Sequence, residues 1–161
     1  FTAFPLGGQI QTRTLTWKVL YTPGHAADHV ALLDQEHGRL FCGDLFLSPK
    51  TRVIMRDESI PLTMRSLRRV LKEDFQAVFC SHGGPLNYGR RLLQKKLDDL
   101  EYLSGEILHL YSLGWTEEAI DARLFPEKWP IIRISKGEFD TIHIVRSVIR
   151  ELAEETPPMS N

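Results

Sequence analysis

Three side chains that could hold a metal ion follow short apolar segments of the sequence. His25 stands in Thr-Pro-Gly-His, Asp44 follows Leu-Phe-Cys-Gly, and His82 follows Val-Phe-Cys-Ser. Imidazole nitrogen and carboxylate oxygen are good donors to zinc and neighbouring divalent ions. A carboxylate can also bridge two metal ions that jointly activate a water molecule. The pattern indicates a metal site, while taken singly each residue also has an ordinary explanation as a turn or cap residue.

The three residues are too far apart in the sequence to share one helix, so they can meet only if neighbouring strands carry them. Residues 14–21 alternate between apolar and polar side chains, which is typical of a half-buried strand. The apolar runs 30–33 and 40–42 flank a polar turn and predict a hairpin, and residues 76–80 predict a further strand. We therefore expect one sheet that brings the ends of these strands together.

A helix is expected after Ser59, which is a suitable N-cap with Pro61 in the first turn. Apolar residues recur along it at steps of three and four. Its other side carries a basic face, which is either a solvated surface or a contact for an anion or a nucleic acid. This basic face comprises Arg65, Arg68, Arg69 and Lys72.

The second half of the chain has helical periodicity. Leucines and isoleucines from Leu93 to Leu110 predict one long amphipathic helix that Gly114 closes. Thr116 can cap a short helix over 117–124, residues 131–134 are short and apolar, and Asp140 can cap a last helix. We expect two regions, 1–87 with the sheet and 88–161 with the helices.

Composition excludes several classes of protein. The chain has 161 residues, a mass of 18.5 kDa and a net charge of −1, which fits one ordinary globular domain and does not favour a basic nucleic-acid binder. No apolar stretch approaches the roughly 18 residues of a membrane-spanning helix. Two cysteines are too few for a disulfide-rich secreted scaffold, so a reducing cytoplasm is the expected location.

Three motifs together resemble a known family of hydrolases. Tyr21–His29 reads Tyr-Thr-Pro-Gly-His-Ala-Ala-Asp-His, Arg39–Asp44 reads Arg-Leu-Phe-Cys-Gly-Asp, and Phe79–Pro85 reads Phe-Cys-Ser-His-Gly-Gly-Pro. At this spacing they look like the second half of the metallo-β-lactamase-fold hydrolases, over about residues 9–86. The helical remainder is similar to the C-terminal extension of some bacterial members of unassigned substrate.

The resemblance implies an α+β fold, the second half of an αββα sandwich followed by helices. It implies that His25 binds a first metal, that His82 binds a second, and that Asp44 bridges both and holds the hydroxide between them. The implied chemistry is attack of this hydroxide on a small-molecule ester, thioester or lactone. The implied cofactor is a pair of zinc ions, with manganese or iron as substitutes.

The family's other ligands come from a His-x-His-x-Asp-His string, and this sequence has none. Its remaining histidines, His37, His109 and His143, are isolated and are expected in turns or on helix surfaces. We therefore expect the chain to be a truncated half of a hydrolase, with Phe1 as a cut, that binds one metal ion or none. Whether it is an enzyme by itself is left open, and the intact protein is expected to be one.

His29 belongs to the Asp-His variant of the motif and has two interpretations of equal weight. It either orients a ligand or contacts substrate from beside the metal site, or it caps the hairpin. Cys42 and Cys80 precede two proposed ligands and are expected to be buried core residues. Arg52, Arg56, Asp57 and Glu58 lie in a loop that either recognises an anionic substrate or is simply solvated.

Two alternative functions come from other classes. The first is a metal-dependent nuclease or phosphodiesterase whose basic helix face and C-terminal helices grip RNA. The second is a non-catalytic module that associates with itself or with its missing N-terminal half, because a half-sheet exposes an apolar face and an unpaired edge. No membrane partner is expected.

Overall fold

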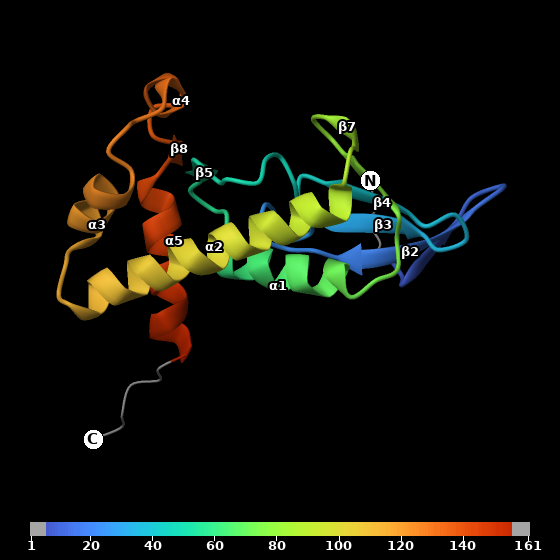
Figure 1. Ribbon diagram of the computed structural model, residues 1–161, viewed down its shortest axis with the longest axis horizontal. Helices are drawn as coiled ribbons and strands as arrows, with labels where there is room; N and C mark the ends of the chain where they lie inside the picture. The colour runs from blue at the N-terminus through green and yellow to red at the C-terminus, as the bar shows by residue number, and fades with distance from the viewer. Residues whose placement is uncertain (1–5, 156–161) are drawn as a thin grey trace.

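The computed structural model describes residues 6–155. Residues 1–5 of the first expected region and 156–161 of the second lie outside the described residues. Figure 1 shows β2, β3, β4 and β7 at one end of the molecule, and α3, α4 and α5 with β8 at the other. The elements in chain order are β1 Gln9–Gln11, β2 Thr16–Tyr21, β3 Val30–Asp34, β4 Arg39–Gly43, β5 Ile54–Met55, α1 Ile60–Leu71, β6 Ala77–Cys80, β7 Gly84–Leu86, α2 Gly89–Ser112, α3 Glu117–Leu124, α4 Pro130–Ile134, β8 Phe139–Asp140 and α5 Ile142–Glu155.

The main sheet has the strand order β1-β2-β3-β4-β6-β7. The predicted hairpin is confirmed, because β3 and β4 pair antiparallel with Leu33 opposite Leu40. β4 and β6 are parallel and are joined through α1, while the other neighbours are antiparallel. β2, β4 and β6 consequently run in one direction, and their carboxyl ends lie at the same edge of the sheet.

α1 begins where the sequence predicts. The Ser59 hydroxyl accepts a hydrogen bond from the backbone N–H of Leu62 at 3.2 Å, and the buried side of the helix includes Leu67 and Val70. The basic face is largely occupied by contacts within the chain. Arg65 pairs with Glu151, Arg68 pairs with Glu101, and Arg69 donates to the carbonyl oxygen of Tyr21.

The helices of the second half share one core with the sheet. α2 packs against α1 and β6, and α5 packs against α1, α2 and α3. The cap expected at Thr116 is confirmed, because its hydroxyl accepts from the N–H of Ala119. Asp140 lies one residue before the N-cap position of α5, which begins at Ile142, and its carboxylate accepts from the N–H groups of Thr141 and Ile142. The buried residues Leu40, Leu67, Leu100, Ile107 and Ile144 belong to one hydrophobic cluster, and the boundary expected at residue 87 stays a prediction.

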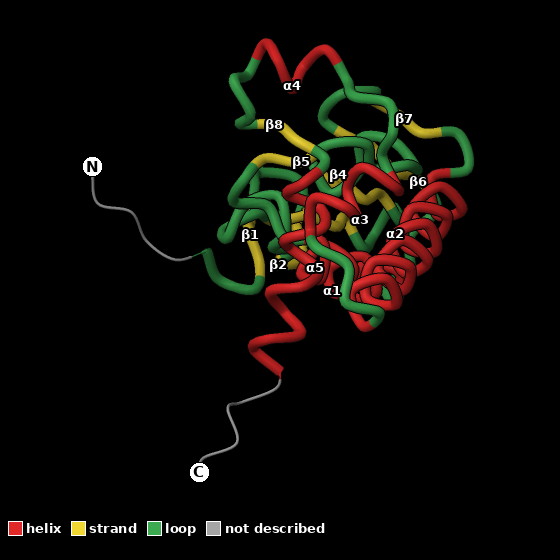
Figure 2. The backbone as a smooth tube through the Cα atoms, turned by 90° about the vertical axis from the view of Figure 1, so that its left-hand side faces the viewer, coloured by secondary structure: helices red, strands yellow, loops and turns green. Residues whose placement is uncertain are grey.

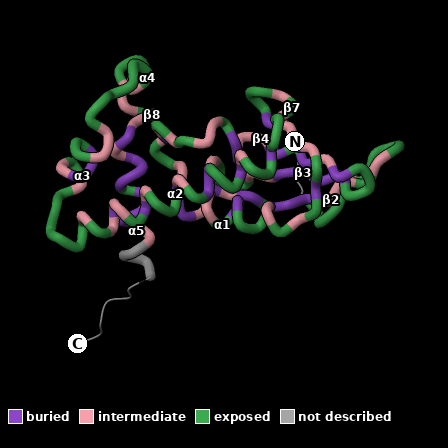
Figure 3. Tube along the Cα trace, in the orientation of Figure 1, coloured by how far each residue is buried: buried purple, intermediate pink, exposed green. Residues whose placement is uncertain are grey.

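The two faces of the sheet have different surroundings. Figure 2 shows α1, α2 and α5 gathered on one side of the strands. That side carries Leu20, Leu33 and Leu40, and Figure 3 shows buried segments along the strands. The opposite face carries a row of aromatic rings, with Trp17 edge-on to Phe41 and Phe41 stacked on Phe79. The Phe41 residue is 40% exposed, so this apolar face is partly open.

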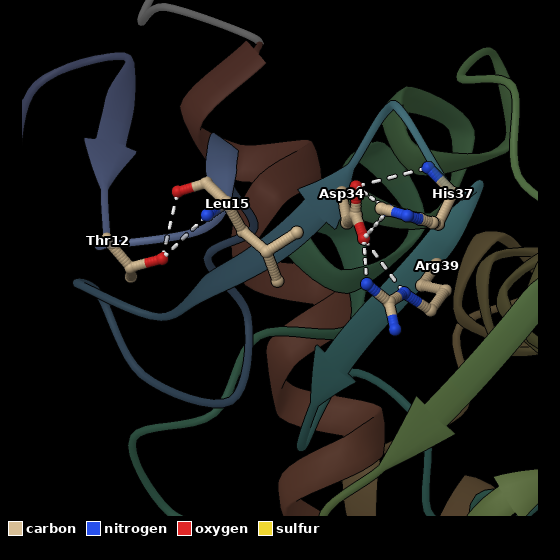
Figure 4. A network of polar contacts seen from close by, with 5 residues as sticks. All are labelled: Thr12, Leu15, Asp34, His37 and Arg39. Carbon is tan, nitrogen blue, oxygen red and sulfur yellow. Dashed lines mark hydrogen bonds and ion pairs between the residues drawn. The ribbon is translucent and has the colours of Figure 1, made fainter.

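Two polar turns brace the strands (Figure 4). Thr12 bonds with Leu15 between β1 and β2, and Asp34 binds His37 and Arg39 in the β3–β4 turn. Burial of Asp34 opposes ionisation, but hydrogen bonds from Arg39 and His37 outweigh it and lower the pKa of this carboxyl. Asp34 thus serves as the charged centre of the hairpin turn.

The short apolar segment 131–134 is part of a helix, α4. Pro130 starts this helix, and its last turn ends near Lys136 and Gly137, which both have positive φ. β8 follows and pairs with β5, which closes a two-stranded sheet. Between residues 6 and 155 the structure contains no helix that is both long and apolar enough to span a membrane.

Candidate metal centre

The three predicted metal ligands come together at one edge of the main sheet. His25 follows β2, Asp44 follows β4 and His82 follows β6, the three strands that run in the same direction. Asp44 lies between the two histidines. Its Oδ2 atom is 3.6 Å from His25 Nε2, and its Oδ1 atom is 3.3 Å from His82 Nδ1.

The chemistry and spacing of these donors fit a divalent metal. Two ligand atoms of a tetrahedral zinc ion, each about 2.0–2.2 Å from it, lie roughly 3.3–3.5 Å apart. Both nitrogen–oxygen distances at Asp44 are close to this spacing. Asp44 Oδ1 is also buried and has no hydrogen-bond partner among the described residues. A buried carboxylate oxygen without a donor is costly unless a cation or water satisfies it.

The arrangement is nevertheless incomplete as a metal centre. Among the side chains described between residues 6 and 151, no three from His, Cys, Asp or Glu form a single group that could hold an ion. The donors form two pairs that share Asp44. A complete centre needs further donors beyond these three side chains.

His29 holds the backbone that carries Asp44. The backbone N–H of Asp44 donates to His29 Nε2 at 3.0 Å, while His29 Nδ1 lies 2.8 Å from the Thr22 hydroxyl and 3.1 Å from the Thr22 carbonyl oxygen. Because Nε2 accepts, the proton of the neutral ring lies on Nδ1. Burial lowers the pKa of His29, which favours this neutral form.

Two glycines allow the site loops to approach their neighbours. Gly43 has φ +54°, and a Cβ atom there would lie 2.6 Å from His29 Nε2. Gly24 has φ +144°, and a Cβ atom there would lie 2.2 Å from Thr63 Oγ1 at the start of α1. The carbonyl oxygen of Gly24 accepts from the N–H of Ser59 at 2.7 Å. A side chain at either position would clash with a neighbour, which explains why the Pro-Gly-His and Gly-Asp segments carry glycine there.

The loop after Gly-Asp was expected either to recognise an anionic substrate or to be solvated, and its residues have different roles in the structure. Glu58 turns inward, and its Oε2 atom is 3.4 Å from His25 Nδ1 while Oε1 accepts from the N–H of Met55. Arg52 lies over the Trp129 ring at 4.2 Å. Glu58 therefore faces a proposed ligand, a role that sequence reasoning missed because Glu58 lies in no recognisable motif.

A cavity of about 430 Å³ lies beside the proposed ligands. It is lined by His25, Asp44 and His82, by the loop over residues 47–54, and by Trp129 and Ile131 from the C-terminal helices. Lys96 of α2 also lines it, although sequence reasoning did not select this residue. The signal was present, because Lys96 interrupts the buried stripe formed by Leu93, Leu97 and Leu100.

The cysteines and the remaining histidines lie outside the two pairs that Asp44 forms with His25 and His82. Cys42 and Cys80 are buried as predicted, and burial raises the pKa of the Cys42 thiol to about 12. His37 lies in a turn and His109 is exposed on α2. The expectation that His143 lies on a turn or helix surface is wrong, because it packs in the buried side of α5 and its Nε2 contacts the carbonyl oxygen of Gly137 at 2.9 Å.

Fold and site together define the class of protein. Residues 5–82 match the model of the metallo-beta-lactamase superfamily, and this part of the chain belongs to that superfamily. The chain is 35% identical over 92 residues to the probable metallo-hydrolase YqjP of Bacillus subtilis (strain 168), a match that covers 51% of this chain and 28% of the relative. It is 27% identical over 93 residues to an atrochrysone carboxyl ACP thioesterase of Aspergillus fumigatus, covering 58% and 29%.

A solved structure confirms the fold over nearly the whole chain. The metallo-beta-lactamase family protein TTHA1429 from Thermus thermophilus matches with a TM-score of 0.69 at 23% identity, covering 96% of this chain and 50% of that one. The α+β fold with C-terminal helices is thereby confirmed. This chain spans about half of that structure, and the matched segment spans under a third of each curated relative named above.

Proposed function

We propose that this chain carries part of the active site of a metal-dependent hydrolase that cleaves an ester, thioester or lactone. The observation that carries the proposal is the position of Asp44 between His25 and His82, with one carboxylate oxygen buried and without a partner among the described residues. The curated relatives support hydrolysis, since they are a probable metallo-hydrolase and a thioesterase. Metal ions are typical of the superfamily.

In this proposal each residue has one task. Asp44 would contact two ions, His25 one of them and His82 the other. An imidazole whose Nδ1 faces a carboxylate is held with Nε2 free to bind metal, which is the relation of Glu58 to His25. His29 would act by holding the Asp44 backbone in place. Bound divalent ions would supply Lewis acidity and an activated water.

Zinc is the proposed metal, because imidazole and carboxylate donors suit it, and manganese or iron are substitutes with the same donors. A cytoplasmic location stays a prediction. The nuclease alternative gains no support from the predicted basic face, because Arg65, Arg68 and Arg69 contact groups within the chain.

Metal analysis tests the proposal directly. We expect protein purified without chelators to contain zinc, manganese or iron, and Asp44→Ala to remove it. His109→Ala is the matched control, because His109 is an exposed histidine on α2 far from the Asp44 pairs in the fold. Protein free of divalent metal, or unchanged hydrolysis of simple thioesters by Asp44→Ala, would overturn the proposal.

We also propose a partner for the open face of the sheet. Trp17, Phe41 and Phe79 form an apolar row on the face opposite the helices. The matched Thermus structure contains about as much chain again beyond the part that aligns with this one. We infer that this face packs against the other half of a superfamily domain, which would also bring the missing metal donors.

Light scattering of the chain alone tests this partner. With the aromatic row uncovered we expect association that increases with concentration. Phe41→Lys should reduce this association, and Tyr102→Lys on exposed α2 should not. A monomer at all concentrations, or equal effects of both variants, would contradict the proposal.

A further inference from the structure

Lys96 is a buried cation that faces the cavity beside the proposed metal ligands. The residue is 8% exposed, and it lines the same cavity as His25, Asp44 and His82. Its neighbours along α2, Leu93, Leu97 and Leu100, are buried core residues. A lysine at such a position is rare unless its charge is matched.

No acidic side chain among those described forms an ion pair with the Lys96 ammonium group. None of the carboxylates between residues 6 and 151 lies within ion-pair distance of Lys96, and its Nζ atom lies 5.9 Å from the centroid of the Phe46 ring. Glu58 is the nearest acidic influence, but its two oxygens are directed to the N–H of Met55 and to His25. Burial lowers the pKa of Lys96, as expected for an unmatched ammonium group.

The rest of the cavity lining is mixed, with the charged side chains of Lys50, Arg52 and Glu58 beside a group of apolar residues. Leu47, Val53, Ile54, Ile131 and Phe139 supply apolar lining. The Thr51 hydroxyl, also in the lining, is buried and has no hydrogen-bond partner among the described residues. A buried cation and a free hydroxyl beside apolar side chains can together bind and orient a carboxylate.

We propose that Lys96, assisted by Thr51, binds a carboxylate of the substrate and thereby orients its apolar chain along the cavity toward Asp44. This inference rests on the proposed function and names its substrate class, an ester or thioester whose apolar acyl chain carries a carboxylate. Lys96 is thus a residue that binds substrate and selects for substrates with a carboxylate.

Calorimetric titration with hexanoate tests the proposal, because hexanoate has the apolar chain and the carboxylate without a bond to hydrolyse. We expect Lys96→Met to weaken hexanoate binding by at least about tenfold, as loss of a charge-assisted hydrogen bond does. Lys96→Gln provides a second neutral variant and should give the same loss. Lys95→Met is the matched control, because Lys95 is exposed on α2. Hexanol, which is neutral, should bind all four proteins alike.

Asp44→Ala separates this inference from the proposed function. It should abolish metal retention but leave hexanoate binding intact, because the carboxylate is assigned to Lys96. Wild-type protein that fails to bind hexanoate would overturn the inference. So would equal binding by the wild type and both neutral variants, or binding that depends on Asp44 and not on Lys96.

Discussion

The backbone N–H of Asp44 donates a hydrogen bond to Nε2 of His29 across 3.0 Å, so the two residues of the Gly-Asp and Asp-His motifs are directly joined. The other ring nitrogen of His29 contacts Thr22 at the end of β2. His29 therefore links the ends of β2 and β4 at the edge where the proposed metal donors meet. Of the two interpretations that the sequence left open, this contact favours support of a ligand.

His29→Ala should weaken both stability and metal retention. The substitution leaves the Asp44 N–H and the buried Thr22 hydroxyl without their partner, which costs about 1–3 kcal/mol for a buried group. Thermal unfolding measures the first effect and metal analysis the second. His109→Ala, at an exposed position, should change neither, and a similar loss in both variants would argue against the linking role.

Gly43→Ala should be more damaging than Gly137→Ala, although both glycines have positive φ, at +54° and +81°. The left-handed conformation costs an alanine about 1–2 kcal/mol at either position. At Gly43 the new Cβ atom would also lie 2.6 Å from His29 Nε2, while at Gly137 nothing lies within 4 Å. Denaturant unfolding of the two variants measures the difference, and equal losses would mean that the His29 contact is unimportant.

Asp34→Asn should destabilise the protein near neutral pH, and the difference from the wild type should shrink in acid. The folded state lowers the pKa of Asp34 below its ordinary 3.8. The stabilising effect is therefore present above pH 3.8 and is lost as the pH falls through the folded-state pKa. Unfolding temperatures across this range measure it. Glu36→Gln, an exposed residue of the same turn, should leave the curve unchanged.

Lys96→Met should keep or raise the melting temperature while it removes carboxylate binding. Methionine preserves the apolar stem among the buried leucines of α2 and removes an unmatched charge from the interior. Thermal unfolding of the variant and of Lys95→Met provides the comparison. A large fall in melting temperature for Lys96→Met alone would show that the ammonium group stabilises the fold, and would remove the reason to assign it to a ligand.

Much of the local structure was predictable because it depends on neighbouring residues. The cap of α1 by Ser59 and the cap of α3 by Thr116 are properties of a few consecutive residues. The hairpin of β3 and β4 likewise follows from two apolar runs around a polar turn. Which face of β2 packs against the helices was harder to infer from the sequence. The apolar side chains of Trp17 and Val19 lie on the face away from the helices, whereas Leu20 lies on the face that contacts them.

The sequence by itself determined which side chains could bind metal and which strands precede them. His25, Asp44 and His82 each follow an apolar strand, and their residue types specify nitrogen and oxygen donors. Only the tertiary structure decided what surrounds them. Glu58 beside His25, and Lys96 in the shared cavity, come from segments with no motif, and the packing of α1 and α2 places them there. Local patterns specify the elements, whereas contacts between distant segments depend on how these elements pack.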